Sequence, residues 1–252
     1  MSISLVAFDL DDTLAHSKAA ISPAMAAALL ELLGARPVCI ISGGRFEQFQ
    51  TQVLTHLASD DRLSRLHLMP TCGTQYLRWQ HGAWVEIYAH ELSPEDRDRC
   101  FSVLEQEARW LGYWTDDQEV YGDRIEDRRS QVTYSALGQS APVELKKRWD
   151  PDGRKREQLR AAVAVLLPEL EVRAGGSTSI DVTQHGIDKA YGIGALSKQE
   201  GWAPQDILFV GDRLEPGGND FPVLALGVQS HAVRGPDETL VYIGELLTQL
   251  RE

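Results

Sequence analysis

The chain has 252 residues, 43% hydrophobic and 25% charged, which is the balance of a globular protein and excludes wholesale disorder. Its formal charge of −12 disfavours a general nucleic-acid or anionic-membrane binder, because both need net positive charge at the contact surface. Three cysteines without a CxxC pair make neither a disulfide framework nor a zinc site. The most apolar helix-like stretch, 24–33, is far shorter than the ~20 residues of a membrane span. We therefore expect a cytoplasmic protein with no nucleic-acid partner and no membrane association.

The first part of the chain alternates strand and helix signals. Residues 3–8 form an apolar run that ends in an acidic turn, and Ser22-Pro23 is typical of the N-cap and first residue of a helix that Gly34 ends. The unbroken apolar run 37–41 predicts a strand covered on both faces, and 45–57 predicts a second helix. This β-α-β-α order predicts a parallel, doubly wound sheet.

The C-terminal part resumes this pattern. An apolar strand over 206–210 ends in Gly211-Asp212, and a Gly/Pro loop then leads to a helix from Asn219. A short strand near Val228 and a closing helix after Pro236 complete the α/β core.

The middle of the chain has a different pattern. A Ser93-x-x-Asp96 capping box predicts a helix up to Leu111, and 153–167 predicts a second, polar helix. Short β-like segments lie around Tyr113, Ile125 and 132–134, and two more strands are expected at 169–173 and 179–183. We therefore predict core segments at 1–82 and 186–252, with an α+β insert at 83–185.

Residues able to carry chemistry follow the predicted core strands. Asp9 and Asp11, then Ser42, then Asp212 come at strand ends, and Lys189 begins the helix that leads back into the core. Open α/β sheets bind ligands at the carboxyl ends of their strands, so these side chains are expected to share one site.

Each of these residue types suits one part of a phosphoryl transfer. Asp9 is the candidate nucleophile, forming an aspartyl phosphate, and Asp11 the candidate general acid and base. A carboxylate oxygen of Asp9, the backbone carbonyl of Asp11 and Asp212 form an oxygen-only set suited to Mg²⁺. Ser42, the amides after it from Gly43 onward, and Lys189 would balance the charge on the phosphoryl oxygens.

The same residues carry a family resemblance. The motif 8–14 (FDLDDTL), with Ser42, Lys189 and Gly211-Asp212, resembles the haloacid dehalogenase (HAD) superfamily of phosphotransferases. The position of the insert is similar to that in the C2-cap subclass IIB, which includes Cof-type sugar phosphatases, sucrose- and trehalose-phosphate phosphatases and eukaryotic phosphomannomutases. Residues 211–220 resemble the phosphomannomutases most closely.

The resemblance implies a fold, a cofactor and a substrate. The fold is a Rossmann-like α/β core with a C2-type α+β cap, the cofactor is Mg²⁺, and the substrate is a hexose phosphate bound by a monomer or a cap-mediated homodimer. In the cap, Ser179 and Asp181 would hold sugar hydroxyls and Arg128 the phosphate that is not reacting. Lys146 and Lys18 stand where this family carries phosphate-binding arginines, so both are candidate substrate ligands.

Two departures from the mutases bear on the reaction. Gln139 stands where a cap arginine is expected, and Asp12 replaces the usual glycine, giving a DxDDT form found among phosphatases. A mutase must hold a sugar bisphosphate by its distal phosphate, whereas a phosphatase needs only water at the aspartyl phosphate. Hydrolysis is therefore our first hypothesis and hexose-phosphate mutase the alternative, with a non-catalytic sugar-phosphate sensor as a remote third. The sequence leaves open whether the loop Pro216–Asn219 helps to hold a second cation.

Overall fold

The computed structural model describes residues 3–114 and 119–251, which divide into two compact units. The first unit comprises Met1–Ala89 with Asp188–Glu252, and the second comprises His90–Ile187. The first unit therefore extends beyond the predicted boundary at residue 82, because the strand Ala83–Ala89 is hydrogen-bonded into its sheet. Among the helices described, none is both long enough and apolar enough to cross a membrane.

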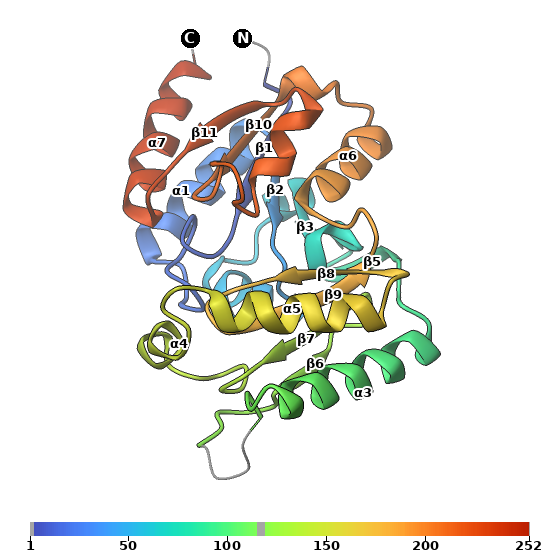
Figure 1. Cartoon of the computed structure of the whole chain (residues 1–252). Helices are drawn as coiled ribbons and strands as arrows, with labels where there is room; N and C mark the ends of the chain where they lie inside the picture. The colour runs from blue at the N-terminus through green and yellow to red at the C-terminus, as the bar shows by residue number, and fades with distance from the viewer. Residues whose placement is uncertain (1–2, 115–118, 252) are drawn as a thin grey trace. The chain divides into compact units, whose positions relative to one another are not determined.

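The first unit is built on a seven-stranded sheet of order β11-β10-β1-β2-β3-β4-β5 (Figure 1). Its five parallel strands are β1 (Leu5–Asp9), β2 (Val38–Ile41), β3 (Leu66–Met69), β10 (Ile207–Gly211) and β11 (Gln229–Ala232). An antiparallel hairpin, β4 (Gln75–Gln80) and β5 (Ala83–Ala89), extends one edge. The turn residues His81 and Gly82 both have positive φ, as a two-residue hairpin loop of type I′ requires.

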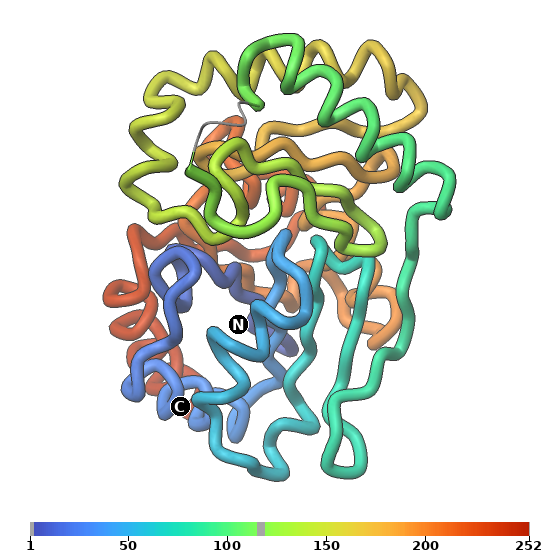
Figure 2. Tube along the Cα trace, turned by 90° about the horizontal axis from the view of Figure 1, so that it is seen from below, coloured from blue at the N-terminus to red at the C-terminus, as the bar shows by residue number. Residues whose placement is uncertain are grey.

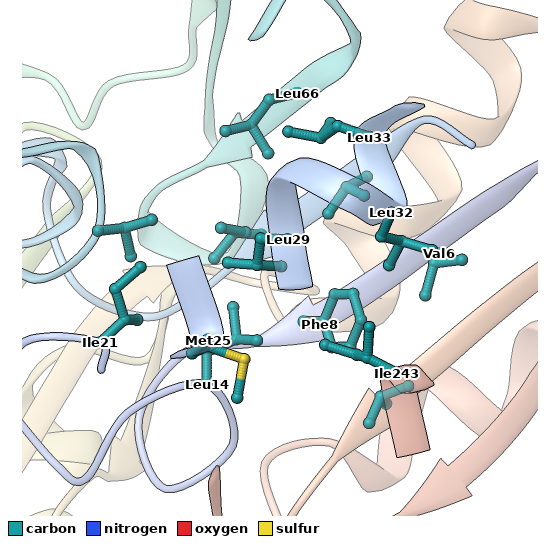
Figure 3. Close-up of a cluster of buried hydrophobic side chains, with 14 of the residues drawn as sticks. Val6, Phe8, Leu14, Ile21, Met25, Leu29, Leu32, Leu33, Leu66 and Ile243 are labelled. Carbon is teal, nitrogen blue, oxygen red and sulfur yellow. The ribbon is translucent and has the colours of Figure 1, made fainter. Parts of the chain in front are cut away.

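Helices cover both faces of the parallel strands, which confirms the doubly wound α/β prediction. Val6 and Phe8 point to one face, where they pack with α1 (Pro23–Ala35) and α7 (Pro236–Gln249). Leu5 and Ala7 point to the opposite face and pack with residues of α6 (Lys189–Glu200). Figure 3 shows Phe8 among side chains of α1 and α7. Each fully buried large apolar side chain contributes roughly 1.5–3 kcal/mol, so packing on both faces stabilises β1 in the middle of the five parallel strands.

Local sequence signals explain where the first helix begins. The Ser22 hydroxyl accepts the Met25 N–H at 3.1 Å and Pro23 occupies the first turn, as predicted. The second helix is shorter than the predicted 45–57, since α2 (Phe46–Gln52) ends at a non-helical Val53. The helix predicted from Asn219 is a 3₁₀ turn over Phe221–Leu226. Four other 3₁₀ turns lie in the described part of this unit, at Leu54–His56, Asp61–Arg65, Thr71–Gly73 and Pro204–Asp206.

The second unit is an antiparallel sheet of order β6-β7-β9-β8 with helices on one face. Its strands are β6 (Ile125–Asp127), β7 (Gln131–Ser135), β8 (Leu170–Ala174) and β9 (Ser179–Gln184), and its helices are α3 (Pro94–Trp110), α4 (Val143–Trp149) and α5 (Arg154–Leu166). Figures 1 and 2 show α3 and α5 side by side, where they bury apolar residues of the sheet. This is the predicted α+β insert, but Tyr113 lies in no strand, since its N–H closes the end of α3 by donating to the Ala108 carbonyl.

Candidate active site

The carboxyl end of β1 carries a buried charge network. The Lys189 ammonium, at the start of α6, lies 2.6 Å from Asp9 Oδ1 and 2.5 Å from Asp220 Oδ1. All three side chains are almost completely buried. Burial alone would lower the pKa of Lys189, but the two carboxylates outweigh it and hold that pKa above its ordinary value. The lysine is therefore a permanent cation beside the candidate nucleophile.

A third carboxylate, that of Asp212 directly after β10, completes the network. Oxygens of Asp9, Asp212 and Asp220 all lie within 4.8 Å of one another. Burial raises the pKa of Asp9; Lys189 opposes that shift, while Asp220 and Asp212 add to it. Burial and repulsion from Asp220 also raise the pKa of Asp212. The Asp212 Oδ1 atom is buried and has no hydrogen-bond partner among the described residues.

These observations fit a bound divalent cation. When ionised, the three crowded carboxylates carry more negative charge than Lys189 balances, and a buried oxygen without a protein partner is a position for a bound ion or water. An all-oxygen donor set is what Mg²⁺ prefers. The sequence assigned the metal to Asp9, Asp212 and the backbone carbonyl of Asp11. The structure adds the carboxylate of Asp220 to this cluster, and the role of the Asp11 carbonyl stays a prediction.

Asp220 is one residue of the candidate site that the sequence reasoning did not assign, although its spacing from Gly211-Asp212 was visible. Its Oδ2 accepts the backbone N–H of Arg213 at 3.0 Å, which ties the ends of the intervening loop together. A Cβ at Gly211 would lie 2.4 Å from Asp220 Oδ2, and one at Gly218 would lie 2.0 Å from the Arg213 carbonyl oxygen. The two glycines therefore allow the loop to fold back and place Asp220 against Lys189.

Asp11, two residues beyond the candidate nucleophile, has different partners. Its Oδ1 accepts the backbone N–H of Lys18 at 2.7 Å and the amide of Gln52 at 3.3 Å, and its Oδ2 accepts the amide of Gln48 at 2.8 Å. Both glutamines come from α2. The sequence analysis did not identify these two glutamines. The one feature that could have indicated them is their four-residue spacing, which places both on one face of the helix after Ser42. The Lys18 side chain is exposed, and its proposed contact with substrate stays a prediction.

Ser42 and Gly43 follow β2, the neighbour of β1 in the sheet. The Ser42 side chain is 4% exposed, and its hydroxyl accepts the Gly44 N–H at 3.1 Å. The Cys72 N–H donates to the Ser42 carbonyl at 2.9 Å, which links this turn to the end of β3. The predicted phosphate-binding turn thus has a fixed backbone at the carboxyl edge of the sheet.

In the second unit, the candidate substrate residues share the sheet face opposite α3 and α5. A row of directly paired residues crosses all four strands there: Glu126, Thr133, Asp181 and Arg173. The Thr133 hydroxyl donates to Asp181 Oδ1 at 2.8 Å. Burial raises the pKa of Asp181, and Arg128 opposes that shift. Ser179 lies two residues before Asp181 on the same strand and therefore on the same face.

Arg128 and Lys146 meet at Gln139. The Arg128 Nε atom lies 2.6 Å from Glu126 Oε2, and its Nη2 donates to the Gln139 side-chain oxygen at 3.4 Å. The Lys146 ammonium, 9% exposed, donates to the Gln139 carbonyl at 2.9 Å. The structure therefore brings together the two cap cations that the sequence singled out, with an uncharged residue between them.

The comparisons with known proteins agree with this architecture. A model of the haloacid dehalogenase-like hydrolase family matches residues 6–234, and the chain belongs to that family. A probable phosphomannomutase of Caenorhabditis elegans is 27% identical, with 99% of this chain and 97% of that protein covered. The phosphomannomutase of Schizosaccharomyces pombe is 24% identical over 96% of this chain and 94% of its own length.

Solved structures support the fold alone. An IMP-bound, N-terminally truncated IMP-nucleotidase of Plasmodium falciparum superposes with a TM-score of 0.71 at 13% identity, over 98% of this chain and 68% of that one. A trehalose-6-phosphate phosphatase related protein gives 0.58 at 16% identity over 98% of both chains. The predicted HAD core with an inserted cap is thereby confirmed.

Proposed function

We propose that this chain is a Mg²⁺-dependent hexose-phosphate mutase of the phosphomannomutase kind. Similarity to phosphomannomutases over nearly the whole length of both chains is the observation that favours this substrate and reaction. It favours the alternative over hydrolysis, which was our first hypothesis from the sequence.

The chemistry rests on the network around Asp9. Ionised Asp9 attacks phosphorus, the bond from phosphorus to the sugar oxygen breaks, and Asp11 gives that oxygen a proton. In the reverse step a sugar hydroxyl attacks the aspartyl phosphate, Asp11 takes the hydroxyl proton, and Asp9 is released. Lys189, 2.6 Å from Asp9, favours the ionised nucleophile. Mg²⁺ held by Asp9, Asp212 and Asp220 would supply further positive charge for the phosphoryl oxygens.

Interconversion of positions on the sugar needs a second anion site. Arg128 and Lys146, which meet at Gln139, are our candidates for the phosphate that is not reacting. Ser179 and Asp181, on the same sheet face as Thr133, are our candidates for the sugar hydroxyls.

Hydrolysis is the second candidate because of Gln139. An arginine at this position would add a third cation beside Arg128 and Lys146, whereas the amide adds none. Weaker binding of the phosphate that is not reacting favours release of the sugar monophosphate before it takes the phosphoryl group back, and water then attacks the aspartyl phosphate.

One assay separates the two reactions. Mannose and glucose 1- and 6-phosphates are incubated with Mg²⁺ or with EDTA, each with and without hexose 1,6-bisphosphate, and isomers and inorganic phosphate are measured together. Bisphosphate-stimulated interconversion supports the mutase, and phosphate release alone supports hydrolysis. Asp9→Asn must abolish both, and equal activity in EDTA would contradict the metal site. If Gln139 limits the second anion site, Q139R raises the ratio of interconversion to hydrolysis.

A further inference from the structure

Helix α2 presents two amides to the candidate acid and base. Gln48 and Gln52 are one turn apart and so lie on the same face of the helix. The Gln48 Nε2 donates to Asp11 Oδ2 at 2.8 Å, and the Gln52 Nε2 donates to Asp11 Oδ1 at 3.3 Å. Each carboxylate oxygen of Asp11 thus has a donor from α2, and rotation of the carboxyl group would break both bonds.

The amide of Gln52 is itself held firmly. Its side chain is 3% exposed, and its Nε2 also donates to the Ala19 carbonyl at 2.7 Å. Its Oε1 is buried without a hydrogen-bond partner among the described residues. A flipped amide would place Oε1 against the Asp11 Oδ1 and Ala19 carbonyl oxygens, which are both acceptors. The orientation in which Nε2 donates to both is therefore favoured, although it leaves Oε1 without a donor.

The backbone before α2 leaves room for Gln48. A Cβ added at Gly44 would lie 2.1 Å from Gln48 Oε1 and would displace the amide from Asp11. The Gly44 N–H is also bonded to the Ser42 hydroxyl, so the same short turn sets both Ser42 and Gln48.

We propose that Gln48 and Gln52 are positioning residues that hold the Asp11 carboxyl where it gives and takes the proton of the sugar oxygen. The inference rests on the proposed phosphoryl transfer, in which Asp11 is the acid and base. The Gln52 amide also donates to the Ala19 carbonyl, so replacing Gln52 would disturb that loop as well. Gln48, whose amide donates to Asp11, is therefore the residue to test.

The test compares two phosphate esters that differ in their need for an acid. A hexose phosphate must have its leaving oxygen protonated, whereas 4-nitrophenolate leaves unprotonated, and kcat/KM reports the first transfer to Asp9. Since general acid catalysis contributes about 10²–10⁴-fold, we expect Q48L and Q48E to lower kcat/KM about tenfold or more for the hexose phosphate and less than about twofold for 4-nitrophenyl phosphate. Q50L, which changes an exposed residue of the same helix, is the matched control and should leave both values unchanged.

A double mutant completes the test. If Gln48 acts through Asp11, adding Q48L to D11N lowers activity no further than D11N alone. Equal losses of kcat/KM with both esters, or a further loss in the double mutant, would mean that Gln48 only supports the fold. Either result would overturn the inference and would leave the proposed phosphoryl transfer intact. Wild-type protein inactive on both esters would overturn the proposed function, and the role of Gln48 with it.

Discussion

Replacing Lys189 by methionine keeps the length of the side chain and removes its charge. The Lys189 ammonium is the protein cation between Asp9 and Asp220, at 2.6 and 2.5 Å, and its side chain is 1% exposed. Removing one partner of a buried ion pair costs about 3–5 kcal/mol, because the remaining charge is left in a medium that solvates it poorly. That loss is a large part of the ~5–15 kcal/mol by which a typical domain is stable.

Urea unfolding of wild type, K189M and K198M in EDTA measures this loss. Lys198 is exposed on the same helix, so K198M should change the free energy of unfolding by less than about 0.5 kcal/mol. Excess Mg²⁺ should stabilise K189M more than wild type, because a cation that binds only the folded state replaces part of the missing charge. A loss below about 1 kcal/mol in EDTA, or equal stabilisation of both proteins by Mg²⁺, would refute the account of a charge-balanced cluster.

Two further predictions concern the core of the first unit. Burial lowers the pKa of His67 from 6.5 to about 3, and Arg78 makes a smaller contribution. As the pH falls below 6.5, the imidazole is therefore protonated in the unfolded chain but not in the folded protein. The free energy of unfolding falls with pH for that reason. Between pH 7.5 and 5.5 wild type should therefore lose about 1.4 kcal/mol more than H67Q in urea unfolding, and identical pH slopes would contradict this. A Cβ at Gly192 would lie 2.6 Å from the Cys72 carbonyl oxygen, whereas at Gly194 the nearest atom is 3.7 Å away. In thermal unfolding G192A should lose about 1–3 kcal/mol and G194A should gain up to about 1 kcal/mol, and equal shifts would argue against tight packing at this helix.

The members of the candidate site that follow directly from strand ends could be proposed from the sequence. Asp9 and Asp212 lie where apolar runs stop, and Lys189 begins a helix, as expected. Asp220 was not assigned because its place depends on how a glycine-containing loop folds back, which no periodicity encodes. Gln48 escaped prediction for a related reason, since its contact requires α2 and the loop after β1 to meet in space.

The fold was predicted well where burial is two-sided and less well at the edges. The buried parallel strands are continuous apolar runs, but β5 has mostly exposed or half-exposed side chains and was assigned to the insert. The predicted strand at Tyr113 failed because aromatic residues suit a helix end as well as a sheet.

The insertion of the second unit also governs the order in which the protein can be assembled. Strand β1 is flanked by β2, which follows it closely in the chain, and by β10, which lies beyond the whole of His90–Ile187. During synthesis, one edge of β1 therefore stays unpaired until β10 has been made. The strands of the inserted unit pair with one another, so its sheet can form before then. Lys189 and Asp220 emerge in the same late segment, so a nascent chain carries Asp9 without its counter-charge, and the charge cluster forms only when the last strands join the sheet.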